Sequence, residues 1–385
     1  MERGDAFELA LRTRLVYGCG AIARLGELAR EIGGERVLVV TDHGVAAAGH
    51  PAIGEATLTE AGFTVQHFED VHENPTTHDV DACLAVAKEF RPDLIVGLGG
   101  GSSMDVAKGT NFLYICGGRM RDYWGVGKAG RPMLPMIAVP TTAGTGSEAQ
   151  SFALIIEAET RQKLACGDSH AAPRVALLDP ELTLTQPPLV TACTGLDALG
   201  HAVETAVTST KNPVSSLFSR EAFRLLARAF PRVLEDPDDI DSRGAMLRGA
   251  AFAGLAIENS MLGAAHSMAN PLTKHFGLPH GQAVAVSLPH VVAFNREDAE
   301  SSRTYAELAA MVTDVPAVGD AGQLVDALRG FLARAGFPTS LADCGVGAGD
   351  VPALAREAAE QWTAQFNPRA VDAGAFERLF TRALE

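Results

Sequence analysis

A change of pattern near the middle of the chain constrains its fold more than any other feature. In the first half, short runs rich in Val, Ile and Leu alternate with stretches of helical periodicity. The predicted strands cover residues 36–41, 64–68, 93–98, 136–139 and 175–178, and the predicted helices between them cover residues 56–61, 80–90 and 102–113. Strands that alternate with helices are typical of a parallel, doubly wound sheet, so we predict an α/β fold for this half.

The strand signals stop at the proline pair Pro187-Pro188. Beyond this pair the pattern is helical, over residues 197–208, 214–229, 242–258, 323–335 and 351–361. We therefore predict an α/β domain over residues 1–188 and an all-α domain over residues 189–385. The length of 385 residues agrees with two domains, because a single core seldom grows beyond about 250–300 residues.

The balance of charged residues argues against two kinds of partner. The chain has 32 Lys and Arg against 47 Asp and Glu, a formal net charge of −15. Such an acidic chain is poorly suited to nucleic acid or to an anionic membrane surface, so we expect neither partner. The apolar segment 244–265 contains Arg248 and Glu258, which favours one buried helix over a membrane span.

The cysteines and the N-terminus bear on the compartment. The six cysteines are scattered and none forms a Cys-x-x-Cys pair, which favours reduced thiols over disulfides or a zinc–thiolate site. The first ten residues include acidic side chains and lack the apolar stretch of a secretory signal. We therefore expect a cytoplasmic protein.

A glycine-rich turn, Gly99-Gly100-Gly101-Ser102, follows the predicted strand 93–98 and precedes a helix. Glycines allow the backbone to approach a ligand closely, and the N–H groups at a helix start attract an anion such as pyrophosphate. We expect Ser102 to cap this helix. The alternative is a tight turn without a ligand, since the third glycine of the GxGxxG fingerprint is absent.

An acidic residue, Asp42, follows the first predicted strand. A carboxylate at this position can bind a ribose diol and repel a 2′-phosphate, which selects NAD over NADP. The alternative role for Asp42 is that of a helix N-cap. The loop 140–148, rich in Thr, Gly and Ser, follows another predicted strand. Its position favours a polar ligand, with helix capping as the alternative.

Four side chains in the second half form a candidate metal site. Asp197 and His201 are spaced i, i+4, so that a helix places them on one face. His266 and His280 follow later in the chain. One carboxylate and three imidazoles suit Fe(II) or Zn(II) and leave room for a substrate oxygen.

Each of these residues also has an ordinary structural interpretation. An acid and an imidazole at i, i+4 often form a surface pair, and a single histidine in an apolar helix is often a core residue. We expect His266 at the end of the apolar helix, where an imidazole without a partner is costly. His280 lies in a Leu-Pro-His-Gly turn that can aim its side chain, while His275 and His290 are rival candidates.

Taken together, these motifs resemble the iron-containing, group III alcohol dehydrogenases. The glycine turn with Asp105 resembles the GGGSxxD motif of that family, and residues 140–148 resemble its PTTAGTGSE loop. Residues 179–182 resemble its DPxL motif, and residues 194–204 resemble TGxDALxHAxE. His266 and Pro279-His280-Gly281 complete a set of matches between about residues 36 and 295, whereas the residues beyond 295 carry no motif that we can assign.

The resemblance implies an N-terminal dinucleotide-binding α/β domain and a C-terminal helical domain, a dehydroquinate synthase-like architecture with the active site in the cleft. It implies that Asp197, His201, His266 and His280 bind Fe(II), with Zn(II) as the alternative. It also implies ten NAD contacts, namely Asp42, Asn74, Gly100, Gly101, Ser102, Thr141, Thr142, Thr145, Lys163 and Leu182. Asp105 is implied to face the nicotinamide end as a catalytic candidate.

The activity implied by the resemblance is hydride transfer between NAD and a small primary or secondary alcohol or aldehyde, with a homodimer as the generic expectation. Two alternatives stay open, polyol oxidation as in glycerol dehydrogenases and a non-catalytic nucleotide-binding sensor of the same fold. A dehydroquinate synthase needs a cluster of basic residues for its phosphorylated substrate. Residues 259–280 offer only Lys274, which argues against that reaction.

One position departs from the family pattern. Many relatives have HxMAHPL after the first helical histidine ligand, whereas this chain has Asn270 at the position of the second histidine. An amide cannot relay a proton as an imidazole can. Either another group such as His275 or a chain of waters performs this role, or the substrate differs.

Overall fold

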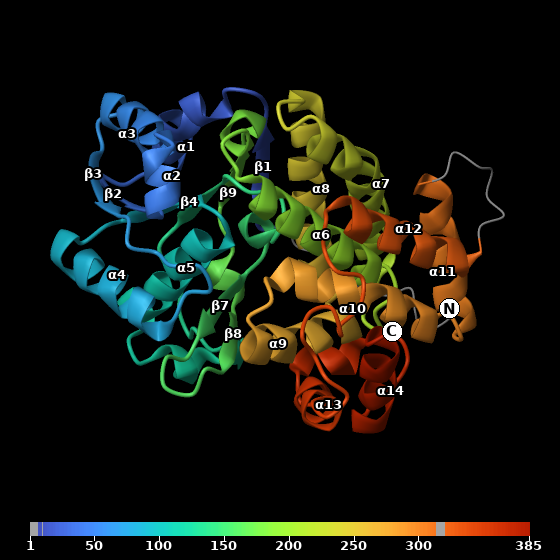
Figure 1. The fold of residues 1–385 in the computed structure, drawn as a ribbon. Helices are drawn as coiled ribbons and strands as arrows, with labels where there is room; N and C mark the ends of the chain where they lie inside the picture. Colours follow the sequence, from blue (N-terminus) through green and yellow to red (C-terminus); the bar gives the residue numbers. More distant parts are fainter. Residues whose placement is uncertain (1–6, 10, 313–319) are drawn as a thin grey trace. The chain divides into compact units, whose positions relative to one another are not determined.

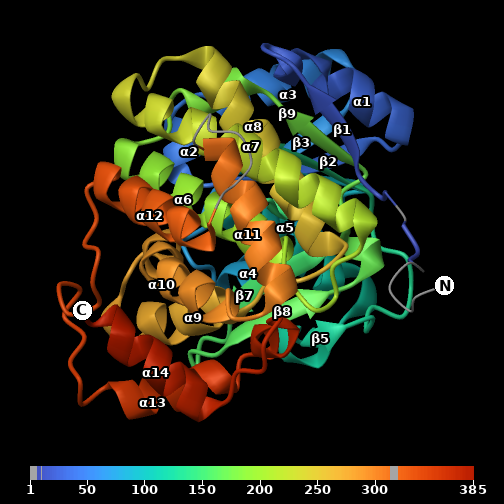
Figure 2. The same cartoon turned by 90° about the vertical axis from the view of Figure 1, so that its right-hand side faces the viewer.

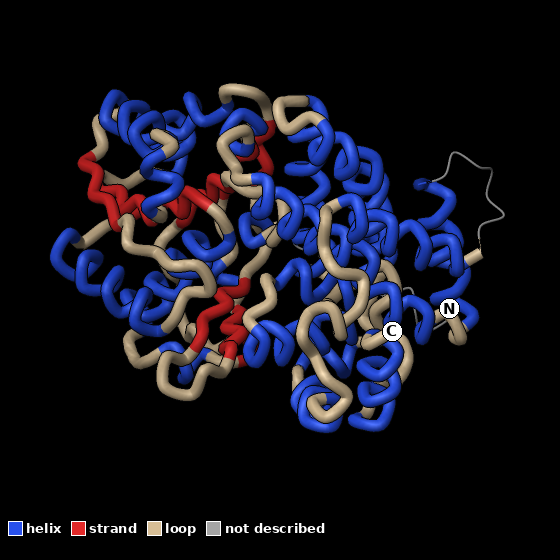
Figure 3. Tube along the Cα trace, viewed as in Figure 1, coloured by secondary structure: helices blue, strands red, loops and turns tan. Residues whose placement is uncertain are grey.

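The computed structural model describes residues 7–9, 11–312 and 320–385. Within them the chain forms two compact units, one within Ala10–Gln186 and the other mainly within Pro187–Glu385. Figure 3 shows the strands in red, and every strand in the described residues belongs to the first unit. The expectation of an α/β part followed by a helical part is confirmed. The division that we predicted after Pro188 lies one residue inside helix α6 (Pro188–Thr205).

The α/β unit is built on a six-stranded parallel sheet with the order β1-β9-β6-β4-β2-β3. Its strands are β1 (Arg14–Tyr17), β2 (Arg36–Val40), β3 (Thr64–Phe68), β4 (Leu94–Gly99), β6 (Met136–Pro140) and β9 (Val175–Leu178). The five predicted strands are all present. The four inner strands are continuous apolar runs, as a sheet that is buried on both faces requires. We did not predict the edge strand β1, which has a single buried residue.

Helices cover both faces of this sheet. They are α1 (Leu25–Ile32), α2 (His43–Ala47), α3 (His50–Glu60), α4 (Thr77–Phe90) and α5 (Gly101–Cys116). Successive strand residues point to opposite faces, so that Val37 and Val39 pack with α1 and α3, while Leu38 and Val40 pack with α4 and α5. Figure 1 shows these two pairs of helices on opposite sides of the sheet.

The order of the strands creates a ligand-binding position. Strands β2 and β4 are neighbours in the sheet. After β2 the chain continues to β3 on one side of this pair, and after β4 it continues to β6 on the other side. A reversal of this kind opens a crevice at the carboxyl ends of the two strands, where open α/β sheets bind ligands. Asp42 follows β2 and the glycine turn follows β4, so both lie at this reversal.

A second, three-stranded sheet was not predicted. It has the order β5-β8-β7 and consists of β5 (Gly125–Val126), β7 (Phe152–Ile156) and β8 (Lys163–Gly167). Strands β7 and β8 form an antiparallel hairpin. The chain turns between them with Arg161 in the left-handed region, a conformation that the sequence does not signal through glycine.

The second unit is helical. Its helices are α6, α7 (Pro213–Glu235), α8 (Ile240–Glu258), α9 (Ala264–Phe276), α10 (His280–Asn295), α11 (Ala299–Val312), α12 (Ala321–Arg334), α13 (Val351–Ala359) and α14 (Ala373–Ala383). Helix α6 packs against α7, α8 and α10, and α9 packs against α10. Near the C-terminus α13 and α14 lie side by side, as Figure 2 shows in red.

One helix prediction was wrong. We expected residues 244–265 to form one helix that ends at His266, but α8 ends at Glu258 and α9 begins at Ala264. His266 therefore lies in the first turn of a separate helix. Among the described residues, no helix is both long enough and apolar enough to cross a membrane.

Candidate metal centre and dinucleotide site

Helices α6, α9 and α10 bring the four predicted metal ligands together. Asp197 and His201 lie on one face of α6, His266 lies in the first turn of α9, and His280 begins α10. The Nε2 atoms of His201, His266 and His280 lie 3.5, 3.4 and 3.9 Å from Asp197 Oδ1. One carboxylate oxygen is thus surrounded by three imidazole nitrogens that come from distant parts of the sequence.

Small residues make this convergence possible. A β-carbon added at Gly200 would lie 2.6 Å from Cγ1 of Val284, so the glycine lets α10 approach α6 closely. The rings of His201 and His266 stack with their centroids 4.9 Å apart. Asp197, His201 and His266 are buried, whereas the side chain of His280 is 24% exposed. The cluster is therefore most accessible at His280.

The chemistry of these donors fits a divalent cation. Asp197 Oδ1 and His266 Nε2 are buried and have no hydrogen-bond partner among the described residues. Such orphaned polar atoms are costly in a protein interior. A carboxylate with three imidazoles is a ligand set that both Fe(II) and Zn(II) accept. Asp197, His201 and His266 alone already meet the spacing that a common metal ion requires.

The electrostatics of the cluster favour its charged forms. Burial opposes the charge of Asp197, but the neighbouring imidazoles of His201, His266 and His280 outweigh it and lower the pKa of this carboxyl. Burial likewise opposes a charge on His266, but the carboxylates of Glu204 and Asp197 outweigh it and raise the pKa of this imidazole to about 9. The carboxylates of Asp197 and Glu204 therefore stabilise a positive charge between them.

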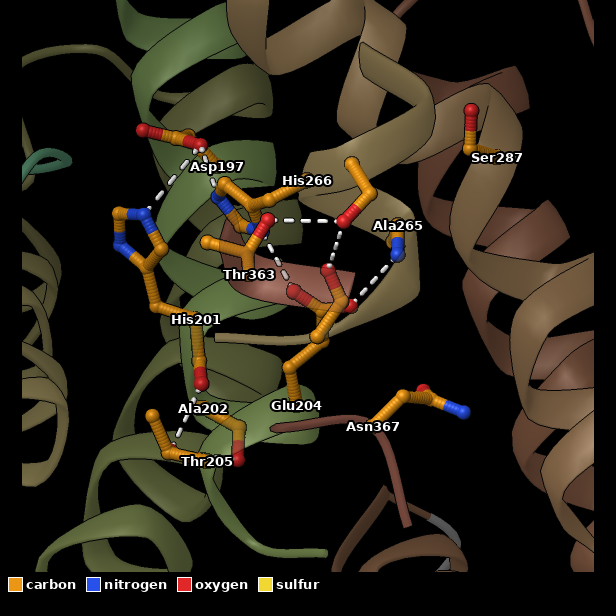
Figure 4. Close-up of polar contacts among 12 residues, drawn as sticks. Asp197, His201, Ala202, Glu204, Thr205, Ala265, His266, Ser287, Thr363 and Asn367 are labelled. Atoms are coloured by element: carbon orange, nitrogen blue, oxygen red, sulfur yellow. Dashed lines mark hydrogen bonds and ion pairs between the residues drawn. The ribbon is translucent and has the colours of Figure 1, made fainter. Parts of the chain in front are cut away.

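Glu204 lies directly behind this cluster. Its Oε2 is 2.5 Å from Nδ1 of His266, and its Oε1 accepts a hydrogen bond of 2.6 Å from the backbone N–H of Ala265. Figure 4 shows the ring of His266 between Glu204 and Asp197. In the sequence, Glu204 stands out only as the last residue of the motif at residues 194–204. Its signal was the spacing of three residues after His201, which places both side chains on one face of α6.

The rival histidines do not join the cluster. Nε2 of His275 lies 2.7 Å from Oε1 of Glu357, and the side chain of His275 is 41% exposed. His290 is buried on α10, where burial, together with the charges of Arg329 and Arg382, lowers its pKa to about 4. This placement does not support the expectation that His275 relays a proton.

Asn270, which replaces the second histidine of the family pattern, lies one turn after His266 on α9. Its Nδ2 donates a hydrogen bond of 2.8 Å to Oε1 of Gln361. The amide is thus bound to another amide, and neither group can accept and release a proton as an imidazole does.

In the α/β unit, the glycine turn and the Thr-rich loop form one structure. The N–H of Thr141 donates to the carbonyl of Gly99, which joins the ends of β4 and β6. A β-carbon at Gly101 would lie 2.7 Å from Cγ2 of Thr145, and one at Gly100 would lie 3.4 Å from Cγ2 of Thr142. The glycines therefore allow the loop to lie directly on the start of α5.

The structure bears on the capping roles that we considered for Ser102 and Asp42. The N-cap of α5 is Gly100, and Ser102 lies inside the helix, so the expectation that Ser102 caps it was wrong. Gly100 occupies the cap in extended conformation and has no side chain that could accept a hydrogen bond from the first N–H groups of α5. Asp42 is an N-cap, because its Oδ1 accepts a hydrogen bond from the N–H of Val45, while its Oδ2 accepts one from Oγ of Ser103.

Asp105 is held inside the unit by Ser147, which is itself held by Lys108. Oγ of Ser147 donates to Oδ1 of Asp105 at 2.8 Å, and Nζ of Lys108 donates to the backbone oxygen and Oγ of the same Ser147 at 2.6 and 2.8 Å. Burial raises the pKa of Asp105 to about 6, although the charge of Lys108 opposes this rise. In this structure Asp105 supports the loop that contains Ser147.

The remaining predicted NAD contacts lie in different environments. Asn74 adopts a left-handed conformation in the exposed loop between β3 and α4. Lys163 begins β8. Leu182 is buried in the core of the unit, so only its backbone is suited to a polar contact. Asp179 of the DPxL motif is structural, since its carboxylate accepts hydrogen bonds from the N–H groups of Gly20, Ile22 and Glu181.

Comparison with known families gives two matches that together cover most of the chain. Residues 12–180 match the iron-containing alcohol dehydrogenase family, and residues 191–384 match the C-terminal region of the Fe-containing alcohol dehydrogenase family. An NAD-dependent methanol dehydrogenase from Bacillus methanolicus is 33% identical over 373 residues, which cover 96% of this chain and 97% of the relative.

Solved structures agree with these matches. A crystal structure of a 1,3-propanediol oxidoreductase is similar with a TM-score of 0.94 and 32% identity, covering 98% of this chain and 100% of the other. The sulfoacetaldehyde reductase from Bifidobacterium kashiwanohense, solved in complex with NAD+, has a TM-score of 0.89 and 26% identity. That similarity covers 99% of this chain and 100% of the reductase.

Proposed function

The chain belongs to the iron-containing alcohol dehydrogenase family, and from this premise we propose that it transfers a hydride between NAD(H) and a small primary or secondary alcohol or its carbonyl product. The observation that carries the proposal is the convergence of three imidazole Nε2 atoms within 3.9 Å of Asp197 Oδ1. A sensor that only binds a nucleotide has no use for such a costly buried cluster.

The helical unit supplies the metal-binding part of the reaction. Asp197, His201, His266 and His280 would hold a divalent cation, Fe(II) or Zn(II), which when bound supplies Lewis-acid stabilisation of an alkoxide. The carboxylate of Asp197 contributes the negative charge that retains the cation. His280 is the most exposed of the four, so a substrate oxygen would enter the cluster on its side.

The α/β unit supplies the cofactor site. The N–H groups at the start of α5 favour the pyrophosphate of NAD, as helix N-termini do generally. The carboxylate of Asp42, at the end of β2, is suited to bind a ribose diol and to repel the 2′-phosphate of NADP. Because Val45 and Ser103 already donate hydrogen bonds to Asp42, this carboxylate is oriented before a cofactor binds.

We infer a short alcohol or diol as the substrate class. Two of the similar proteins are named for methanol and 1,3-propanediol, and a third is named as a reductase of sulfoacetaldehyde. These are small molecules with a primary alcohol or an aldehyde. Oxidation of glycerol-like polyols is the second candidate, since it requires the same metal chemistry.

We further propose that the enzyme works in the cytoplasm as a homodimer. The compartment is supported by the six cysteines, which are scattered along the sequence without a Cys-x-x-Cys pair, as is usual where thiols stay reduced. The dimer is the commonest assembly of soluble enzymes. Light scattering on the purified protein measures its mass in solution, and a mass of one chain would contradict the dimer.

The test of the proposed function is an anaerobic reconstitution. The purified protein is stripped with a chelator, reloaded with Fe(II) or Zn(II), and assayed with short alcohols, diols and glycerol in the presence of NAD or NADP. We expect NADH formation that depends on the metal and is faster with NAD than with NADP. Activity confined to glycerol would favour polyol oxidation, whereas no metal-dependent turnover with any alcohol or aldehyde would contradict the proposal.

A further inference from the structure

We propose that Glu204 is a positioning residue, which sets the ring of His266 in the one tautomer and orientation that can bind a metal. This inference rests on the proposed metal site but concerns a residue outside the ligand set. Glu204 is 3% exposed and lies on α6, on the same face as Asp197 and His201. Its carboxylate contacts α9 at two points, the ring of His266 and the backbone of Ala265.

The hydrogen-bond partners of Glu204 determine where the proton of His266 lies. A carboxylate only accepts hydrogen bonds, so Nδ1 of His266 must carry the proton that it shares with Oε2 of Glu204 at 2.5 Å. A metal binds only the neutral imidazole, and when a cation replaces the second proton of His266, the lone pair of Nε2 is free. That lone pair faces Oδ1 of Asp197 at a distance of 3.4 Å. Two acceptors that face each other in a buried site favour a cation between them.

The same carboxylate also holds the helix that carries His266. Helix α9 has Gly263 at its N-cap, and no side chain at that position caps it. The first N–H groups of a helix need acceptors, and Glu204 provides one for Ala265 from a different helix. The negative charge of Glu204 is also favourable at this place, because the dipole of a helix attracts negative charge to its N-terminus. Glu204 therefore fixes both the backbone and the ring of His266.

The space around Glu204 leaves its carboxylate little freedom. A β-carbon at Gly263 would lie 3.1 Å from Oε1 of Glu204 and 3.2 Å from Oδ1 of Asn367. Asn367 is itself fixed, because it exchanges two hydrogen bonds of 3.0 and 2.8 Å with Asn295. The absence of a side chain at residue 263 thus allows Glu204 to reach α9 without being displaced.

The variant Glu204→Gln tests this role while keeping the size of the side chain. Both neighbours of Glu204 are donors, but an amide has one acceptor oxygen and one donor nitrogen. If the amide nitrogen faces His266, Nδ1 becomes the acceptor and the proton moves to Nε2, which then cannot bind a metal. If the amide oxygen faces His266, the nitrogen opposes the N–H of Ala265 and α9 loses its cap.

The experiment measures binding of Co(II) alone to the chelated, full-length protein, because the visible spectrum of Co(II) reports its ligands. We expect Glu204→Gln to bind Co(II) about 10–100-fold more weakly than the wild type, with altered visible bands. The matched control is Ser267→Ala, at the residue after His266 in α9, which removes a buried hydroxyl that bonds to the carbonyl of Gly263 and to Oγ1 of Thr363 in the segment Trp362–Phe366. The control is expected to keep the affinity and spectrum of the wild type.

Equal affinities and spectra for the wild type and Glu204→Gln would overturn the proposal. A wild type that does not bind Co(II) would instead contradict the metal site, and the proposal with it, so the two failures are distinguishable. If Glu204→Gln does not fold, Gly263→Ala provides a second test, because its new methyl group presses on Oε1 of Glu204. Weaker Co(II) binding by Gly263→Ala would support the proposal, and wild-type binding would contradict it.

Discussion

Gly281, the second residue of α10, packs directly against the backbone of Cys193 in α6, so that a β-carbon at residue 281 would lie 1.9 Å from the carbonyl oxygen of Cys193. This contact involves rigid backbone and cannot relax through a side chain. It brings the first turn of α10, and with it His280, to the helix that carries Asp197. The geometry of the candidate metal site thus depends on a residue outside the predicted ligand set.

Replacement of this glycine should displace His280. We expect Gly281→Ala to lower the free energy of unfolding by about 1–3 kcal/mol or more, because added atoms in a packed contact force the backbone apart. Metal affinity and turnover should fall with it. Chemical denaturation and metal binding measure both effects. The matched control is Gly330→Ala in α12, where a β-carbon meets no atom within 4 Å and should stabilise the helix by about 0.5–1 kcal/mol.

A second prediction concerns the buried Lys108 in the α/β unit. Its Nζ donates to Ser147 and to the carbonyl of Phe152, and Ser147 in turn donates to Asp105. Lys108→Met should destabilise the unit by about 3–5 kcal/mol, because it removes the stronger of the two positive charges, Lys108 and Lys163, that act on the buried carboxylate of Asp105. The affinity for NAD should fall as well, since Ser147 ends the Thr-rich loop.

A double-mutant cycle isolates the coupling between Lys108 and Asp105. The double variant Asp105→Asn/Lys108→Met removes both charges of this pair. Its loss of stability should therefore be smaller than the sum of the two single losses by more than about 0.5 kcal/mol. Strictly additive losses would show that the two groups do not interact.

The pH dependence of stability should report the buried Glu148. Burial raises the pKa of Glu148 from 4.5 to about 7, against smaller opposing effects of a backbone hydrogen bond and Lys108. Between these values the folded protein keeps a proton that the unfolded chain has lost. This group therefore makes the free energy of unfolding decrease as the pH rises from about 4.5 to about 7, with a slope of up to about 1 kcal/mol per pH unit.

The variant Glu148→Gln removes this titration while it keeps the size of the side chain. Comparison of its denaturation curves with those of the wild type over the same pH range cancels the contribution of all other groups. We expect the stability of the variant, relative to that of the wild type, to increase as the pH rises from about 4.5 to about 7. Parallel curves for the two proteins would contradict the raised pKa.

Sequence patterns predicted the α/β unit better than the helical unit, for physical reasons. The inner strands β2, β4, β6 and β9 are buried on both faces, so each is an unbroken apolar run that is visible in the sequence. Helices α9 and α10 were missed because Pro271 and Pro289 lie inside them. A proline normally ends a helical prediction, but tertiary packing keeps both helices intact.

In the candidate site, too, some features could be predicted from the sequence and others could not. The four residues of the candidate metal site were predicted from their spacing and donor chemistry and from the family resemblance, and the structure brings their side chains together. The role of Glu204 could not be predicted, because its partner His266 comes from a different helix and no local spacing connects them. The same holds for Ser147 and Asp105, whose contact depends on how the Thr-rich loop packs on α5.

The position of His275 gives a further prediction. His275 pairs with Glu357, with which Lys274 also pairs, and exposed pairs of this kind contribute at most about 1 kcal/mol. We therefore expect His275→Gln to retain wild-type turnover and pH profile, as should the control Lys274→Gln. A loss of about 100-fold or more in kcat with an altered pH profile, for His275→Gln alone, would instead identify His275 as the proton relay.

The central claim is that Asp197, His201, His266 and His280 bind one divalent cation on which turnover depends. Anaerobic metal analysis of the wild type and of Asp197→Ala, combined with an NADH assay on the same samples, tests it most directly. The account predicts one bound ion per chain and full turnover for the reconstituted wild type, and neither for Asp197→Ala. An Asp197→Ala protein that keeps both its metal and its turnover would contradict the account.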